Sequence, residues 1–256
     1  MVNGEVRPEV QPELKRTLWV IGADDYNLGM TVAQVAREEQ LYERVYPTDE
    51  AMDVGNQELL VRYLTNLRKE SPQTGVDIAY CAGINLLDAI EDVDELNIWQ
   101  TFNVNVMGFI RVLQAVRRVY AGMMDGRTPL TPQTTSNVVL VASDAARIPM
   151  RRSITYCASK AAAVQAMRVA ARELAPYVRV NAVSPGIIDG TPMTTSIDAE
   201  VRQQRHWTEE QALDYERQQI PMQRRATKWE VADQILLTLN GPAYLTGANI
   251  EINGGK

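Results

Sequence analysis

Short apolar runs alternate along the chain with longer segments in which apolar residues recur at helical spacing. Each run ends at small or polar residues, which is typical of parallel strands that are buried on both faces of a sheet. The predicted strands are residues 17–22, 43–48, 76–81, 137–142, 178–183 and 248–252.

The intervening segments carry apolar residues three and four positions apart, so that Leu60, Leu64 and Leu67 share one side of a predicted helix. Because strands and helices alternate from residue 17 to about residue 183, the pattern predicts an α/β fold. We expect a doubly wound, Rossmann-like parallel sheet in a three-layer α/β/α arrangement. The predicted helices are residues 31–40, 56–69, 98–120, 155–174 and 230–239.

The chain length of 256 residues suits one large domain, which we place at residues 17–256. Residues 1–16 are polar and contain prolines, and we expect them to form a flexible N-terminal arm. They lack the apolar core of a signal peptide. No run approaches the roughly 20 apolar residues of a membrane span. We therefore expect a protein that does not contact membranes. Because its two cysteines form no disulfide framework, we also expect a reducing, cytoplasmic setting.

Composition and charge exclude several classes of function. A net charge of −6 disfavours nucleic-acid binding, and the arginine pairs at 151–152 and 224–225 are too short to form a basic patch. We interpret both pairs as solvated surface. Two cysteines and a single histidine, His206, lack the spacing of a zinc site or a disulfide framework, so no metal is expected.

The candidate chemistry lies on the predicted helix 155–174. Tyr156 and Lys160 are four residues apart, which places both side chains on one helix face. A nearby ammonium lowers the pKa of a tyrosine and lets it exchange a proton with a carbonyl or alcohol oxygen near neutral pH. Ser143 follows the preceding strand, and the carboxyl ends of parallel strands face the ligand crevice. These three side chains are therefore expected to meet.

The order of Ser143, Tyr156-Cys-Ala-Ser-Lys160 and Asn181-Ala-Val-Ser-Pro-Gly186 resembles the short-chain dehydrogenase/reductase family, small single-domain type. The resemblance covers residues 17–255. It implies an NAD(P)-dependent oxidoreductase that transfers a hydride between the cofactor and a ketone or secondary alcohol. Tyr156 would be the general acid/base, Lys160 would lower its pKa and bind the nicotinamide ribose, and Ser143 would hold the substrate oxygen. Asn105 would be the fourth catalytic residue, holding a water in a proton relay.

The same resemblance implies a set of cofactor contacts. Asp53 and Val54 resemble the pair that contacts the adenine ring, and residues 81–83 occupy the place of the family's Asn-Ala-Gly. With Asp49 at the end of the second strand included, the predicted cofactor-binding residues are Gly22, Asn27, Leu28, Gly29, Asp49, Asp53, Val54, Cys81, Ala82, Gly83, Tyr156, Lys160, Pro185, Gly186, Ile188 and Thr191.

The phosphate loop departs from the family pattern. Residues 22–29 contain one inserted residue, and Asn27 replaces the middle glycine. Asparagine is the next-best residue at positive φ, so we expect Asn27 to preserve the turn. The segment after residue 48 is also short, as if one helix and one strand were missing or merged. Cys81 replaces a structural asparagine and is interpreted as a small buried residue.

The identity of the cofactor depends on the end of the second strand. An acidic residue at that point accepts from a ribose 2′-hydroxyl and repels a 2′-phosphate. Asp49 occupies this place, which favours NAD, with NADP still possible.

The segment 191–226 is polar with scattered apolar residues at helical spacing, and by resemblance it would close over the substrate. The family also implies a homodimer or homotetramer through the helix 155–174. The alternative to the enzyme is a binding or regulatory protein with this fold, impaired dinucleotide binding and no turnover. An epimerase or dehydratase is disfavoured by chain length, and an enoyl reductase by its wider spacing of Tyr and Lys.

Overall fold

A computed structural model describes residues 16–49, 52–71, 74–124, 126–131 and 135–256. The strands in these residues form one parallel sheet in the order β2-β1-β3-β4-β5-β6. The sheet confirms the predicted doubly wound α/β fold. The strands are β1 (Thr17–Ile21), β2 (Arg44–Thr48), β3 (Val76–Tyr80), β4 (Ser136–Val141), β5 (Val178–Pro185) and β6 (Asn249–Ile252).

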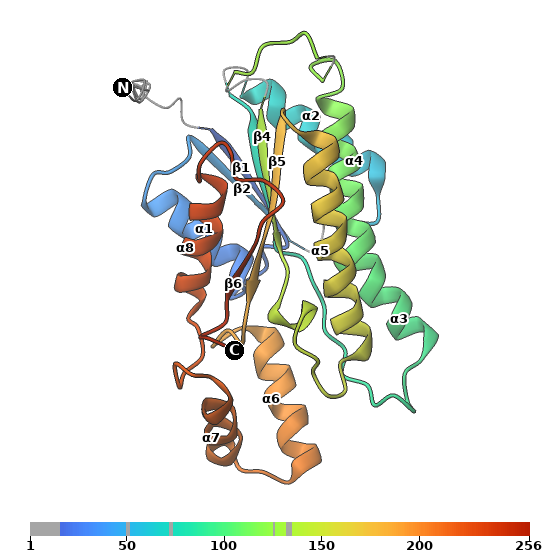
Figure 1. The fold of residues 1–256 in the computed structure, drawn as a ribbon, viewed down its shortest axis with the longest axis vertical. Helices are drawn as coiled ribbons and strands as arrows, with labels where there is room; N and C mark the ends of the chain where they lie inside the picture. The colour runs from blue at the N-terminus through green and yellow to red at the C-terminus, as the bar shows by residue number, and fades with distance from the viewer. Residues whose placement is uncertain (1–15, 50–51, 72–73, 125, 132–134) are drawn as a thin grey trace, which may run out of the picture.

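Helices cover both faces of the sheet, as Figure 1 shows, which gives the predicted three layers. One layer contains α1 (Leu28–Glu38) and α8 (Lys228–Leu239), which pack against each other. The other contains α2 (Gln57–Glu70), α4 (Phe109–Val119) and α5 (Ile154–Leu174). A single helix, α2, joins β2 to β3 in the described chain, in keeping with the shortening seen in the sequence.

The core divides between the two faces because successive strand residues point in opposite directions. Trp19 and Ile21 pack with the layer of α2, α4 and α5. Leu18 and Val20 pack with α1 and α8. All four side chains are 0% exposed, so β1 is buried on both faces, as its continuous apolar sequence predicts.

The predicted helix 98–120 differs from the structure in one functionally important way. The helix starts earlier, at α3 (Glu95–Phe102), and then widens into a π-helical segment, Asn103–Gly108, before α4. The Tyr80 hydroxyl donates to the Val104 carbonyl at 2.6 Å, and it leaves no room for a Cβ at Gly108. π-Helical turns inside helices are frequent at functional sites, and this one carries Asn105.

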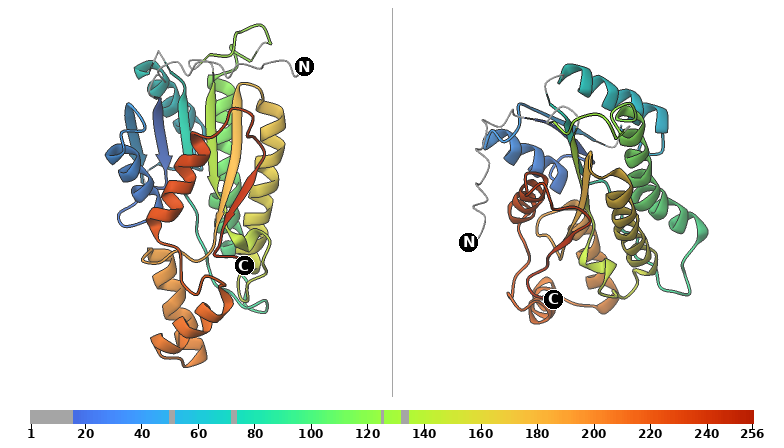
Figure 2. Two further views of the ribbon diagram at one scale, coloured as in Figure 1. Left: turned by 60° about the vertical axis from the view of Figure 1, so that its left-hand side comes forward. Right: turned by 45° about the horizontal axis from the view of Figure 1, so that its top comes forward.

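Two helices extend beyond the carboxyl ends of the strands, as both views in Figure 2 show: α6 (Pro192–Arg205) and α7 (Glu209–Gln219). They occupy the segment that the sequence indicates as a substrate lid. Arg225 ties them to the body through a two-point contact with Asp198 at 2.8 Å and a contact with Glu216 at 2.6 Å. The Arg225 side chain is only 11% exposed, so this network is sheltered from solvent.

The predicted N-terminal arm lies outside the described residues except for Arg16. That residue belongs to the folded domain, because its guanidinium pairs with the buried Asp77 at 2.9 Å. Among the described helices, none has the length and apolar character needed to cross a bilayer.

Candidate active site

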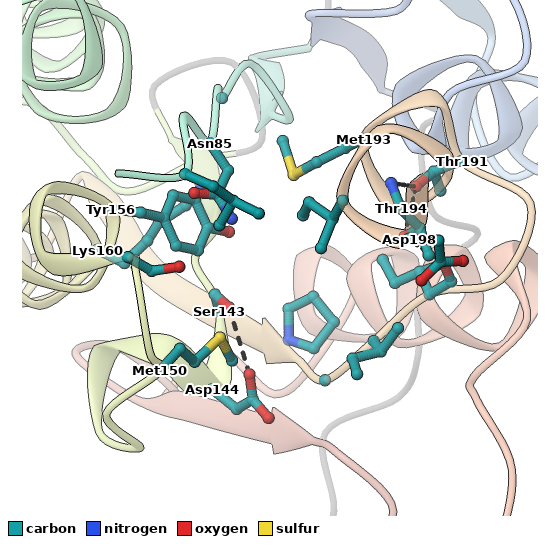
Figure 3. A pocket seen from close by; sticks show the side chains of 18 of the residues that line it. Asn85, Ser143, Asp144, Met150, Tyr156, Lys160, Thr191, Met193, Thr194 and Asp198 are labelled. Carbon is teal, nitrogen blue, oxygen red and sulfur yellow. Dashed lines mark hydrogen bonds between the residues drawn. The ribbon is translucent and has the colours of Figure 1, made fainter. Parts of the chain in front are cut away.

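Tyr156 and Lys160 lie side by side near the start of α5, as predicted from their spacing (Figure 3). Lys160 Nζ is 5.6 Å from the centre of the Tyr156 ring and donates to the Val141 carbonyl at 3.0 Å. The two residues are 7% and 4% exposed, respectively. The bond to Val141 ties Lys160 to the end of β4, so the pair is held against the sheet.

Burial dominates the protonation of this pair. Loss of hydration raises the pKa of Tyr156 to about 12, although a hydrogen bond with Ser143 opposes the shift. The sequence led us to expect a lowered tyrosine pKa beside an ammonium, and for the protein alone this expectation was wrong. Burial lowers the pKa of Lys160 to about 8, against a smaller opposite effect of Cys81. At neutral pH the site therefore holds a protonated phenol beside a charged ammonium.

Ser143 stands where the chain leaves β4 and enters a short 3-10 turn, Asp144–Ala146. Its Oγ accepts from the Ala145 amide at 3.2 Å and lies 3.4 Å from Asp144 Oδ1. Figure 3 shows Ser143 between Tyr156 and Asp144 at the wall of the cavity. The serine is thus placed to hold an oxygen that also faces Tyr156.

Asn105 lies behind the cavity wall, in the π-helical segment, and is 1% exposed. Its amide nitrogen donates to the Ile84 carbonyl at 2.9 Å and to Ser159 Oγ at 3.0 Å, and its oxygen accepts from the Ile84 amide at 2.9 Å. These bonds use both the nitrogen and the oxygen of the side-chain amide. A Cβ at Gly83 would lie 3.2 Å from Lys160 Nζ and 3.4 Å from Asn105 Oδ1, so the two side chains converge on that glycine.

A cavity of about 990 Å³ opens beyond the carboxyl ends of the strands and brings most of the predicted residues together. Ser143, Tyr156 and Lys160 line it. The other predicted residues in its lining are Asn27, Leu28, Gly29, Cys81, Gly83, Pro185, Gly186, Ile188 and Thr191. One cavity thus connects the N-terminus of α1 with the Tyr156 site and the base of α6.

The remaining predicted residues do not line this cavity. Gly22 packs against Ala82, since a Cβ on Gly22 would come within 2.6 Å of the Ala82 Cα. Val54 packs against Gly108 of the π-helical segment. Asp49 and Asp53 are exposed beyond β2, where Asp53 accepts from the Gly55 amide at 2.7 Å. The adenine-side contacts therefore remain predictions.

The turn of the phosphate loop forms differently from our expectation. Asn27 has φ −87°, not a positive value, and caps α1 by accepting from the Met30 amide at 3.0 Å. Its amide nitrogen donates to the Gly22 carbonyl and to Asp24 Oδ2, each at 3.1 Å. The positive φ angles belong to Gly22 and Tyr26. Because of the inserted residue, the tight turn comes before Asn27, at Tyr26, and Asn27 caps the helix instead.

Gly29 makes a testable contact in this loop. A Cβ at Gly29 would lie 2.2 Å from the Gly22 carbonyl oxygen, closer than any real contact. We expect Gly29→Ala to lower the free energy of unfolding by about 1–3 kcal/mol, the usual cost of overpacking, and to weaken dinucleotide binding. Urea denaturation measures the first effect. Gly122→Ala is the control, because its Cβ would meet nothing within 4 Å; equal stability of the two variants would contradict the expectation.

Several lining residues escaped the sequence interpretation. Arg151 and Arg152 are exposed, as expected of solvated surface, and they also line the cavity because the loop 147–153 folds towards α6. The same interpretation was wrong for Arg225, whose side chain is 11% exposed because it pairs with Asp198 and Glu216. For the lining residues on α6, the available signal in the sequence was the helical spacing of apolar residues after residue 192. The additional lining residues include Asp24, Asn85, Leu87, Asp144, Met150, Pro192, Met193, Thr194, Ile197, Asp198, Val201, Gln204, Arg205 and Glu216.

The residues of the cavity fit a dinucleotide. The N-terminus of α1 points its amides at one end of it, and helix N-termini favour phosphate. The close approach at Gly29 keeps that loop tight, and Gly83, which has no side chain, leaves the space next to Lys160 Nζ at the cavity wall unfilled. Burial raises the pKa of the Cys81 thiol to about 12, which keeps it protonated and supports its interpretation as a packing residue.

Comparison with known proteins agrees with this geometry. A family model described as enoyl-(acyl carrier protein) reductase matches residues 20–256. The NAD-dependent glycerol dehydrogenase of Listeria innocua is 30% identical over 206 residues, which cover 80% of this chain and 72% of the relative. The 2,3-dihydro-2,3-dihydroxybenzoate dehydrogenase of Escherichia coli is 27% identical over 255 residues, covering 94% of this chain and 96% of the relative.

The fold is likewise shared with solved structures. A variant of the actinorhodin polyketide ketoreductase with NADPH superimposes with a TM-score of 0.79 at 21% identity, covering 94% of this chain and 96% of that chain. The sheet, the cavity and these similarities together show that the chain belongs to the short-chain dehydrogenase/reductase family, enzymes that interconvert CH–OH and C=O groups with a nicotinamide cofactor.

Proposed function

We propose that the protein transfers a hydride between a nicotinamide cofactor and a ketone or secondary alcohol, with Tyr156 as the general acid/base. The observation that carries this proposal is the meeting of Ser143, Tyr156 and Lys160 at the wall of one cavity. The cavity, at about 990 Å³, lies at the upper end of the range for ligand pockets. The cofactor supplies the hydride, and the chain's own residues manage the oxygen and the proton.

Each side chain has a separate task in this proposal. Ser143 Oγ donates to the substrate oxygen, and the Tyr156 hydroxyl gives that oxygen its proton during reduction. Lys160 stabilises the phenolate that remains and binds the nicotinamide ribose. Asn105 braces the wall behind Lys160, and the water relay through it remains a prediction. A phenol whose pKa is raised to about 12 is protonated at neutral pH, which suits carbonyl reduction.

Carbonyl chemistry is favoured over enoyl reduction. The matching family model has an enoyl reductase description, but Tyr156 and Lys160 are four residues apart here, and enoyl reductases of the family space this pair more widely. The relatives named for glycerol and for 2,3-dihydro-2,3-dihydroxybenzoate are both dehydrogenases, which supports a substrate with an alcohol carbon.

The second candidate is a protein of this fold that binds or regulates without turnover. The altered phosphate loop favours it, because Asp24 stands in the cavity lining near the predicted phosphates. Reduction of any ketone of a small panel, followed as loss of NADH absorbance, would support the enzyme. Saturable binding of a ketone without cofactor oxidation would support the second candidate.

The cofactor preference is the first measurement to make. Asp49 is exposed at the end of β2, where a carboxylate accepts from a ribose 2′-hydroxyl and repels a 2′-phosphate. We expect NADH to bind at least about tenfold more tightly than NADPH, since about 1.4 kcal/mol of repulsion gives that ratio. Titration with each cofactor, followed by nicotinamide fluorescence, measures it. Preference for NADPH would overturn the role of Asp49 but keep the enzyme, and binding of neither would favour the second candidate.

We also propose that the protein is cytoplasmic and forms a homodimer or homotetramer. Exposed apolar side chains gather on α3, the π-helical segment and the start of α4, next to α5, and large exposed apolar patches mark interaction sites. Light scattering on the purified protein tests the assembly. These side chains are Leu96, Ile98, Trp99, Met107 and Ile110.

A further inference from the structure

A buried carboxylate stands immediately beside the proposed substrate-binding serine. Asp144 is 1% exposed and lines the cavity. Its Oδ1 lies 3.4 Å from Ser143 Oγ. Its Oδ2 is buried without a hydrogen-bond partner among the described residues, and the nearest cation is Lys256 Nζ at 3.7 Å. Burial raises the pKa of Asp144, against the opposing charge of Lys256.

The hydrogen bonding of this carboxylate must change when substrate binds. A serine hydroxyl has one proton to donate. Without substrate, the Ser143 proton faces Asp144 Oδ1. In the proposed function the same proton turns to the substrate oxygen, so Asp144 loses its hydroxyl donor and keeps the Ala145 amide and the charge of Lys256. Its Oδ2 has no hydrogen-bond partner among the described residues. A buried acceptor left unpaired costs about 1–3 kcal/mol, and more when it is charged. A substrate that returned a donor to Asp144 would avoid this cost.

The positions of the three side chains indicate where that donor would be. Figure 3 shows Asp144 on the side of Ser143 away from Tyr156. In the proposed function the reacting oxygen lies between Tyr156 and Ser143, so a substituent of the reacting carbon that extends past Ser143 reaches Asp144. Ser143 Oγ and Asp144 Oδ1 are 3.4 Å apart. This is short enough for two oxygens on adjacent substrate carbons to bind them, one to Ser143 and the other to Asp144.

We propose that Asp144 accepts a hydrogen bond from a hydroxyl on the carbon next to the reacting one, so that the substrates are vicinal diols and α-hydroxy ketones. The inference rests on the proposed function and specifies its substrate class. A negatively charged acceptor favours a substrate with a hydroxyl at this position over one with only carbon-bound hydrogen, which donates no hydrogen bond to it. A site built around a substrate hydroxyl discriminates strongly against an analogue without one.

Matched substrates test the proposal. The wild-type protein is assayed with NAD⁺ on trans-1,2-cyclohexanediol against cyclohexanol, and on 2,3-butanediol against 2-butanol. We expect kcat/KM to be at least about tenfold higher for each diol, the effect of one hydrogen bond to a charged group. Asp144→Ala should remove this preference by slowing the diols selectively. Asp144→Asn, which keeps the shape and a neutral acceptor, should retain part of it.

The control and the outcomes separate this proposal from the proposed function. Asp233→Ala, on the exposed side of α8, should leave the diol preference unchanged. Oxidation of diols and simple alcohols at equal kcat/KM by the wild-type protein overturns the role of Asp144 but keeps the dehydrogenase. Equal slowing of both classes in Asp144→Ala, with NADH binding intact, would mean that Asp144 only positions Ser143. If neither diol is oxidised but ketones of the panel are reduced, the role of Asp144 is overturned and the dehydrogenase stands. If none of the four alcohols is oxidised and no ketone is reduced, both proposals are overturned.

Discussion

Tyr156→Phe is expected to lower kcat for carbonyl reduction by about 10³-fold and to leave NADH binding unchanged. The substitution removes only the hydroxyl, and a positioned general acid contributes about 10²–10⁴-fold to such reactions. The ring remains packed on α5, where the residue is 7% exposed, so the fold and the Lys160 contacts to Val141 persist. Single-turnover reduction with NADH separates this chemical step from cofactor binding.

A matched tyrosine provides the control. Tyr177 is 6% exposed, and its hydroxyl donates to the Thr128 carbonyl at 2.9 Å, at the opposite end of the sheet. Tyr177→Phe should lower stability by about 1 kcal/mol, the net value of one hydrogen bond, and leave kcat near the wild-type value. If Tyr156→Phe retains full turnover on a ketone that the wild-type protein reduces, then Tyr156 is not the proton donor and the proposed mechanism is wrong.

The fold could be predicted because each strand carries its own signal. The run Leu18-Trp-Val-Ile21 is apolar at every position, as expected of a short strand buried on both faces, and the structure buries each of these side chains. The meeting of Tyr156, Lys160 and Ser143 followed from equally local facts. Two residues share a helix face, and the third ends a strand at the ligand edge of a parallel sheet.

The remaining features depend on contacts between distant parts of the chain, which local patterns do not contain. The π-helical segment arises where the Tyr80 hydroxyl meets the Val104 carbonyl. The conformation of Asn27 depends on how residues 22–26 fold back, since its side chain bonds to the Gly22 carbonyl. The pKa of Tyr156 could not be predicted from the proximity of Lys160 alone, because burial acts in the opposite direction and is stronger.

Substitution of Lys160 should produce the second-largest effect, and its pH dependence tests the proposed role directly. When Tyr156 gives up its proton, the phenolate left behind is buried, and a charged neighbour stabilises it. Lys160→Met removes the charge but keeps an unbranched side chain of similar length. We expect kcat for reduction to fall by about 100-fold at neutral pH, the lower end of what one preorganised charge donor contributes.

The pH profile of the wild-type protein should change where the Lys160 ammonium titrates. Burial lowers the pKa of Lys160 to about 8, so the side chain is charged below this pH and loses its proton as the pH rises through it. kcat for reduction should therefore be level below about pH 8 and decline above it. The Lys160→Met variant has no charge to lose, and its profile should show no decline in this range. An identical decline in both proteins would assign the titration to another group, and the ammonium of Lys160 would then have no part in stabilising the phenolate.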